Sequence, residues 1–301
     1  MIVKKSQFFA LFNGLLKTTL MAVMLCFVSI STVGAVAVCS PISDANFYSS
    51  SASNANLDGC MYITLADTPA LYTVYATIQS SQTPLEITFS ATAAPGPSVV
   101  LSAQGVFFIR WGNGSVLRIN KTDTSPQRYF FGSSTSGTTT VKIYSNTNVI
   151  SNYNPYCPAI TFNPHNVTGK GQKCGGGISS SVAGSITSVG GCLGCVFPTL
   201  SSGTQPLFIG SFANLPNLTN IPGDNFFYDG TTGITGQAIN YQFAFMFHND
   251  TSLQNTTLPS NYFNGLTKAG ISTFYGMFSK DGVADISGDA WSSGLYCIHQ
   301  K

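Results

Sequence analysis

Few residues of this 301-residue chain have a type and spacing that could do chemistry. The clearest case is the C-x-x-C unit Cys192-Leu-Gly-Cys195, which in other settings is a redox-active dithiol or half of a zinc site. A redox dithiol normally opens a helix in a thioredoxin-like βαβ unit, and zinc needs two further ligands from a matched pair. The surrounding sequence offers neither, so we expect structural disulfides here, with redox chemistry and metal binding as the alternatives.

The histidines form no recognisable catalytic set. They are His165, His248 and His299. None has a serine, cysteine or carboxylate at the spacing of a nucleophilic triad, and the sequence contains no nucleophile elbow. We expect His248, which directly follows a phenylalanine motif, to be an exposed turn residue.

Three aspartates, Asp281, Asp285 and Asp289, recur every four residues in a glycine-rich stretch. Carboxylates are calcium ligands, but this spacing matches no calcium loop, so solvated turn residues are the preferred interpretation. The sequence therefore predicts no catalytic residue, no cofactor and no metal site.

The N-terminus predicts export. Lys4 and Lys5 precede an apolar run over 19–38, and Ala35-Val36-Ala37 is a small-x-small cleavage signal. Residues 1–37 thus resemble a secretory signal peptide, which indicates a secreted or cell-surface protein. An uncleaved membrane anchor is the alternative, because the apolar run is nearly long enough to span a bilayer.

Composition excludes several kinds of partner. Removing the leader takes away three of the 13 basic residues and none of the 11 acidic ones, which leaves a net charge of −1. No basic patch stands out, so we expect neither nucleic acid nor membrane insertion after cleavage. The chain is 44% hydrophobic and only 8% charged, as in β-rich secreted proteins that solvate their surfaces with hydroxyls and amides.

Export makes disulfides the expected state of the cysteines. Seven remain after the leader: Cys39, Cys60, Cys157, Cys174, Cys192, Cys195 and Cys297. Proximity favours Cys39 with Cys60, across an irregular segment over 38–69, and Cys157 with Cys174. Closing a loop of that size stabilises the fold by about 3 kcal/mol on the chain-entropy model. The odd count leaves one thiol unpaired, and the sequence does not fix the connectivity.

Hydrophobicity alternates with period two from residue 70 onwards. The predicted strands are 71–78, 85–91, 106–111, 115–119 and 139–144. Short alternating strands separated by Gly, Ser and Pro predict an antiparallel β-sandwich over 70–150. Asn113-Gly114 predicts a two-residue hairpin turn between the third and fourth strands. Residues 151–196, rich in Asn, Gly, Ser and Cys, are interpreted as a connector with little regular structure.

The hairpin segment carries a family resemblance. Residues 109–114, IRWGNG, resemble the W-x-x-G-D-G signature of polycystic-kidney-disease (PKD) type domains, which are immunoglobulin-like β-sandwiches. Tyr129 and residues 140–143 resemble the tyrosine corner and final strand of that pattern. Two positions depart from it, because Asn113 replaces an acid and Gln127 stands where a histidine is expected. The resemblance implies an immunoglobulin-like sandwich over 70–150, and another small sandwich is the alternative.

Paired phenylalanines repeat along the C-terminal third, with periods of 35 and then 31 residues. The predicted repeat-core residues are Phe208, Phe212, Leu218, Ile221, Phe226, Phe243, Phe247, Leu253, Leu258, Phe263, Phe274, Phe278, Ile286 and Trp291. Stacked coils would align these rings into a ladder, in which each buried Phe contributes about 1.5–3 kcal/mol. An array of so few repeats is not expected to be stable alone. We therefore expect the segment to pack on the sandwich or on a partner.

The repeated unit, F-x-x-M-F-x-x-x-x-S-L followed by (I/L)-P-x-x-x-F, resembles the leucine-rich repeats of BspA-like bacterial surface proteins over 197–295. It does not match the commoner short consensus with its asparagine ladder. The resemblance implies a solenoid over 197–301 and a non-catalytic adhesion or recognition function towards a protein or glycan. The alternatives are a secreted thiol-redox or hydrolytic enzyme using the Cys192/Cys195 region, and a structural component of a surface layer or stalk.

Overall fold

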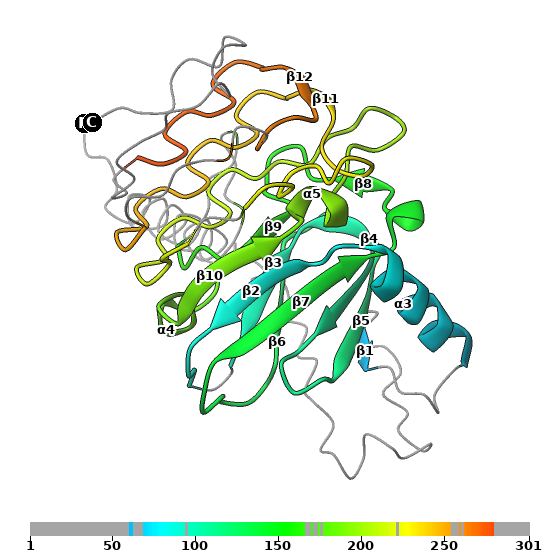
Figure 1. Cartoon of the computed structure of the whole chain (residues 1–301), viewed down its shortest axis with the longest axis vertical. Helices are drawn as coiled ribbons and strands as arrows, with labels where there is room; N and C mark the ends of the chain where they lie inside the picture. Colours follow the sequence, from blue (N-terminus) through cyan, green and yellow to red (C-terminus); the bar gives the residue numbers. More distant parts are fainter. Residues whose placement is uncertain are drawn as a thin grey trace, which may run out of the picture. The chain divides into compact units, whose positions relative to one another are not determined.

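The chain is mainly β, with antiparallel sheets and a few short helices (Figure 1). The computed structural model describes residues 60–62, 69–93, 96–165, 170, 174, 177–220, 223–253, 259 and 262–279. Within these ranges no helix is long and apolar enough to cross a bilayer. The predicted signal peptide lies outside them.

The larger sheet has seven strands, and all of its pairs are antiparallel. Its order is β1 (Cys60–Tyr62), β5 (Val116–Lys121), β4 (Ala103–Arg110), β7 (Thr139–Ser145), β2 (Leu85–Phe89) and β10 (Ile186–Gly191), and β8 (Asn152–Tyr153) pairs with β4. Strands β2, β4, β5 and β7 confirm four of the five predicted strands. Their alternation places one set of side chains, such as Ile87 and Ile109, fully inside the core.

A second sheet of three strands, in the order β6 (Gln127–Phe130), β3 (Ser98–Leu101) and β9 (Ile160–Thr161), contributes to the same core. Ser102 alone separates β3 from β4, so the chain passes from one sheet to the other at that residue. Its hydroxyl donates a hydrogen bond to the carbonyl of Pro158, which fixes the crossing.

The predicted strand over 71–78 is wrong, because this segment is the helix α3 (Pro69–Ser81). Proline suits the first turn of a helix, where its missing N–H has no partner to lose. The helix buries Tyr75, whose ring lies 5.5 Å from Phe108 and 5.9 Å from Tyr144 on the sheet. The neighbouring Val74 is 38% exposed. Packing of one helical face overrode the local period-two pattern.

The hairpin between β4 and β5 differs from its prediction in length. The N–H of Trp111 donates to the carbonyl of Ser115 at 2.9 Å, and the N–H of Gly114 donates to the carbonyl of Trp111 at 2.8 Å. The loop therefore has three residues, with Gly112 and Asn113 at the turn centre. Gly114 follows with a φ of +89°, in the left-handed region that residues with a Cβ atom rarely adopt.

The predicted connector over 151–196 has more regular structure than expected. Besides β8 and β9 it contains the helices α4 (Ser180–Ala183) and α5 (Leu193–Val196), and β10 is a full strand. Ile186 and Val189 of β10 pair with β2 and are buried at 0% and 2% exposure. A register shift separates these two residues, so the bulge and the Gly/Ser content together hid the strand pattern from sequence reasoning.

Residues 197–279 form what we call the coil stack, drawn from yellow-green to orange in Figure 1. Its backbone is mostly turns, apart from the short parallel pair β11 (Gly236–Gln237) and β12 (Leu266–Lys268). Over 208–214 and 241–249 every second N–H donates to the next coil, for example from Phe243 to Thr273 at 2.8 Å and from Phe247 to Met277 at 2.9 Å. One continuous hydrophobic core joins both sheets to the coil stack, so the expected packing against the sheets is observed.

Candidate binding surface and the buried disulfide

Three columns of stacked rings run through the coil stack. In the first column Phe208 lies 6.0 Å from Phe243, which lies 5.4 Å from Phe274, both pairs at 12° between ring planes. In the second, Phe212, Phe247 and Phe278 follow at 5.5 and 5.3 Å. The rings that the repeat alignment makes equivalent are therefore neighbours in space.

The third column differs from the sequence alignment by one residue. Phe226, which the alignment matches to Phe263, stacks on Tyr262 at 6.1 Å and 18°. Phe263 stacks instead on Phe227 at 5.1 Å and 14°. Each coil carries two adjacent aromatics at this point, so the alternation of inward positions could not be assigned from spacing alone.

The second column starts outside the repeats. Phe162, in the loop after β9, stacks on Phe212 at 5.6 Å and 11°, so the two-sheet part supplies the first ring of the column. Leu218 and Leu253 are fully buried beside the rings, as the repeat pattern predicts. The other predicted core residues, Ile221, Leu258, Ile286 and Trp291, lie outside the described residues.

A ladder of asparagine side chains accompanies the rings, which sequence reasoning missed. The amide of Asn249 donates to Asn214 at 2.9 Å, and the amide of Asn214 donates to Asn163 at 3.3 Å. Asn214 and Asn249 have φ values of +62° and +64°, a region that asparagine tolerates well. Their common position two residues after the second phenylalanine was the available signal.

One edge of the coil stack exposes large apolar side chains. Tyr241, Ile271 and Tyr275 are 40%, 70% and 42% exposed, three of the six exposed large hydrophobic residues in the described part of the chain. Tyr241 donates its N–H to the carbonyl of Ile271 at 3.1 Å, and the ring of Tyr275 meets the half-buried ring of Phe245 edge-on at 5.2 Å. We call Tyr241, Phe245, Ile271 and Tyr275 the edge patch.

Ring and side-chain contacts surround Phe245 of the edge patch. The ring of Phe245 lies over Gly276, where an added Cβ would come within 2.7 Å of Phe245 Cε1. His248 Nδ1 lies 2.6 Å from Ser279 Oγ, and its ring contacts Phe245 at 5.5 Å. His248 lies in a turn, as predicted, but it is half-buried and paired, which corrects the prediction that it is exposed.

The edge patch carries little charge. Among the described residues from 236 to 279, Lys268 is exposed, whereas Asp250 is fully buried and accepts a 2.7 Å hydrogen bond from the N–H of Leu215. Burial also raises the pKa of Tyr262, inside the third ring column, well above its ordinary value.

The disulfide between Cys157 and Cys174 packs against apolar side chains of the coil stack. The structure contains this bridge, which is the pairing that sequence proximity predicts. Its cysteines pack in one cluster with Leu207, Ile209 and Ala244 of the coil stack. Cys60 lies in β1, and its predicted partner Cys39 and the remaining Cys297 lie outside the described residues, so the Cys39–Cys60 pairing stays a prediction.

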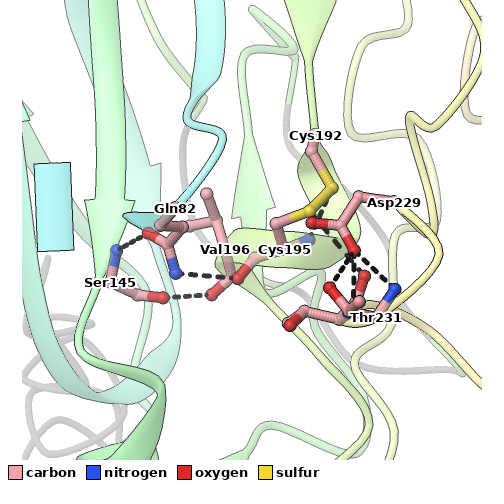
Figure 2. Close-up of a disulfide and its surroundings, with 8 residues drawn as sticks. Gln82, Ser145, Cys192, Cys195, Val196, Asp229 and Thr231 are labelled. Atoms are coloured by element: carbon pink, nitrogen blue, oxygen red, sulfur yellow. Dashed lines mark hydrogen bonds between the residues drawn. A yellow bond between two sulfur atoms is a disulfide. The ribbon is translucent and has the colours of Figure 1, made fainter. Parts of the chain in front are cut away.

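The C-x-x-C unit also forms a disulfide, at the junction of the sheet and the coil stack (Figure 2). Cys192 and Cys195 are 0% and 1% exposed. Thiol–disulfide exchange requires a thiolate to reach a sulfur atom, so this burial argues for a structural bridge. Within the described residues no group of three metal-ligating side chains is present.

Helix α5, whose first turn is spanned by the Cys192–Cys195 bridge, connects the seven-stranded sheet to the coil stack. Gln82 donates to the carbonyl of Cys195 at 3.0 Å and accepts from the N–H of Ser145 at 2.9 Å, while Ser145 Oγ donates to the carbonyl of Val196 at 2.7 Å (Figure 2). On the other side the N–H of Gly194 donates to the carbonyl of Phe226 at 3.0 Å. The sheet and the coil stack are both hydrogen-bonded to this one turn of helix.

Asp229, close to the bridge in Figure 2, organises a turn of the coil stack. Its carboxylate accepts hydrogen bonds from the N–H groups of Thr231 and Thr232 at 2.8 and 2.7 Å. Burial acts to raise the pKa of Asp229, but these hydrogen bonds outweigh it, and the pKa lies below its ordinary value. These hydrogen bonds to backbone N–H groups indicate that Asp229 stabilises the turn. The aspartates considered for calcium, Asp281, Asp285 and Asp289, lie outside the described residues.

Comparison of the chain with protein-family models, curated proteins and solved structures found no match.

Proposed function

We propose that this chain is a non-catalytic binding protein, exported to the medium or the cell surface, whose coil stack recognises a protein or glycan. The observation that carries the proposal is the edge patch, where Tyr241, Ile271 and Tyr275 are exposed on an otherwise well-buried stack. Tyrosine supplies contact area at a low cost in side-chain entropy, and the contact of Tyr275 with Phe245 reduces the freedom that remains to be lost. The low charge of the surface favours a neutral ligand.

We also propose specific fold families for the two parts. Support for an immunoglobulin-like, PKD-type sandwich comes from the two antiparallel sheets and from Tyr129, whose hydroxyl donates to Gln127 Oε1 at 2.6 Å. Gln127 holds the position where the PKD pattern has histidine. Support for a BspA-like leucine-rich-repeat solenoid comes from the stacked phenylalanine columns and the buried Leu218 and Leu253.

A binding screen tests the proposal. Residues 38–301 are presented to arrays of glycans, matrix proteins and cell surfaces, and each hit is measured again with the double variant Tyr241→Ala/Tyr275→Ala. We expect a saturable hit that the double variant weakens at least about tenfold, the effect of losing buried contacts of about 1.4 kcal/mol. Tyr156→Ala is the matched control, because Tyr156 is 42% exposed outside the edge patch.

Point variants are preferable to deleting residues 197–301, because the coil stack shares its core with the sheets. A hit that survives in the double variant, or that Tyr156→Ala weakens equally, would remove the edge patch as the binding surface. Absence of any saturable hit would argue against the binding function itself.

A thiol-redox enzyme is the second candidate, and the Cys192–Cys195 bridge is the observation behind it. The measurement is the rate at which dithiothreitol exposes two alkylatable thiols in the folded chain. Reduction as fast as that of an exposed disulfide would favour redox chemistry, whereas a bridge that opens only on unfolding would favour binding.

A further inference from the structure

The outer face of the seven-stranded sheet collects cations that are far apart in the sequence. In β4 and β5, Phe107, Ile109 and Leu117 point into the core with 0% exposure. Because side chains alternate along a strand, Arg110 and Arg118 point the opposite way. Lys142 of β7 lies directly opposite Arg110 in the strand register, on the same outer face. Two of the chain's three arginines and a lysine thus share one surface, which we call the cation row.

The cation row is only partly neutralised. Lys142 Nζ lies 2.6 Å from Glu86 Oε1 of the neighbouring strand β2, so the described residues supply one carboxylate to three cations. Arg110 and Lys142 are like charges directly opposite one another, an arrangement that weakens a sheet unless something else compensates it. Arg118 Nε is buried without a hydrogen-bond partner in the described part of the chain, so its guanidinium is already partly desolvated.

Hydroxyl groups border the cation row on the same face. Thr88 and Thr140 lie opposite one another on β2 and β7, with their Oγ1 atoms 3.2 Å apart, and Ser188 of β10 lies opposite Thr88. The row is accessible, because the Lys142 and Glu86 side chains are 39% and 37% exposed. At Gly190, opposite Glu86, an added Cβ would meet nothing within 4 Å.

Helix α3 covers the end of this face that Arg118 borders, because Arg118 lies opposite Phe108 in the strand register. Helix α3 packs there through Tyr75, which buries Phe108 and Tyr144. Among the described residues, what remains open on this face is a polar surface of charges beside hydroxyls.

We propose that the cation row binds an acidic saccharide, with a carboxylate or sulfate group on Arg110, Arg118 and Lys142 and sugar hydroxyls on the bordering Thr88 and Thr140. Arginine pairs with carboxylates and with tetrahedral oxyanions through two parallel hydrogen bonds, and a threonine hydroxyl can donate to or accept from the hydroxyl of a sugar. Nucleic acid is a poorer fit, because its affinity depends on neutralising many phosphates, and this face offers three cations and one carboxylate. This site is separate from the edge patch, so neither proposal rests on the other.

Titration of residues 38–301 with three polysaccharides tests the proposal: polygalacturonate carries carboxylates, dextran sulfate carries sulfates, and dextran is neutral. We expect saturable, salt-sensitive binding of at least one acidic polymer and none of dextran; the polymer that binds identifies the anionic group. Arg110→Gln should weaken this binding about tenfold, the effect of one charge-assisted hydrogen bond. Lys268→Gln, which removes the same charge from an exposed residue of the coil stack, should leave it within about twofold.

Equal losses in Arg110→Gln and Lys268→Gln would show that net charge alone attracts the polymer, and would overturn the site. Failure of both acidic polymers to bind, or tighter binding of a single-stranded DNA oligonucleotide, would overturn the saccharide assignment. The edge-patch variant Tyr241→Ala/Tyr275→Ala should retain acidic-polymer binding, which separates this test from that of the proposed function. A thermal melt checks that Arg110→Gln is folded. Because the substitution removes the repulsion between Arg110 and Lys142, its melting temperature should be equal to or higher than that of the parent chain.

Discussion

Replacing Phe247 tests whether the ring columns stabilise the molecule. Phe247 is fully buried and stacks on Phe212 at 5.5 Å and on Phe278 at 5.3 Å. Phe247→Ala should lower the free energy of unfolding by about 3–5 kcal/mol, as for other buried phenylalanines. Two ring pairs account for about 1–3 kcal/mol of that loss, at about 0.5–1.5 kcal/mol a pair. Phe247→Leu keeps most of the volume, so it should isolate this smaller part.

The measurement is urea denaturation of residues 38–301 followed by circular dichroism. Phe245→Leu is the matched control, because Phe245 is half-buried two residues away and meets its aromatic neighbours only edge-on. It should cost about 1 kcal/mol or less. Were Phe247→Leu to cost no more than Phe245→Leu, stacking in the columns would not be a source of stability, and the columns would follow from the backbone coils alone.

The same experiment reports whether the core is one cooperative unit. Trp111 is buried at 2% exposure in the two-sheet part, well away from Phe247 in the sequence. With the second tryptophan, Trp291, replaced by Phe, the fluorescence of Trp111 should follow the same urea transition as circular dichroism and shift with it in Phe247→Ala. A Trp111 transition that ignores Phe247→Ala would mean that the two parts unfold separately, despite their shared contacts.

Three further predictions concern the junction. Gly194→Ala should lower stability by more than about 2 kcal/mol, because an added Cβ would lie 1.9 Å from the carbonyl oxygen of Phe227; Gly137→Ala, with nothing within 4 Å, is the neutral control in a thermal melt. Cys192 and Cys195 should resist reduction and alkylation until the chain is unfolded in urea, as mass spectrometry would show, because both are buried. Asp229 has a lowered pKa when folded, so its contribution is complete above its unfolded pKa of about 3.9 and is lost as the pH falls through the folded value. The stability difference between the parent chain and Asp229→Asn should therefore shrink on acidification, and a constant difference would contradict the turn-capping role.

Sequence reasoning succeeded where one face of an element is buried and the other is not. Buried and half-buried residues alternate throughout β2 and over 140–143 of β7, so their period was visible. It failed at α3, where Tyr72, Val74, Ala76 and Ile78 happen to alternate as in a strand. The helix is selected by the fit of Tyr75 against Phe108 and Tyr144, which belong to strands distant in the sequence. No local pattern contains that information.

The candidate sites show the same division. Paired phenylalanines at a regular spacing predicted the ring columns, because equivalent residues of stacked coils must meet. The exact neighbour of Phe226 depended on a one-residue difference between coils that spacing could not resolve. The cation row was invisible to sequence reasoning, since Arg110 and Lys142 become neighbours only through the register of β4 with β7.

The junction explains how so short a coil stack can be stable. Repeat arrays need a partner for the open face of their first coil, and three coils are few for an independent core. Here the two-sheet part supplies that partner: Phe162 begins the second ring column, Asn163 begins the asparagine ladder, and Phe197 lies between Phe107 of β4 and Phe208 of the first coil. The sheets therefore act as the N-terminal cap of the coil stack, and the buried Cys192–Cys195 bridge lies at the point where cap and stack are joined. A function carried by the edge patch consequently depends on the two-sheet part as well, although the contacts of the patch lie in the last two described coils.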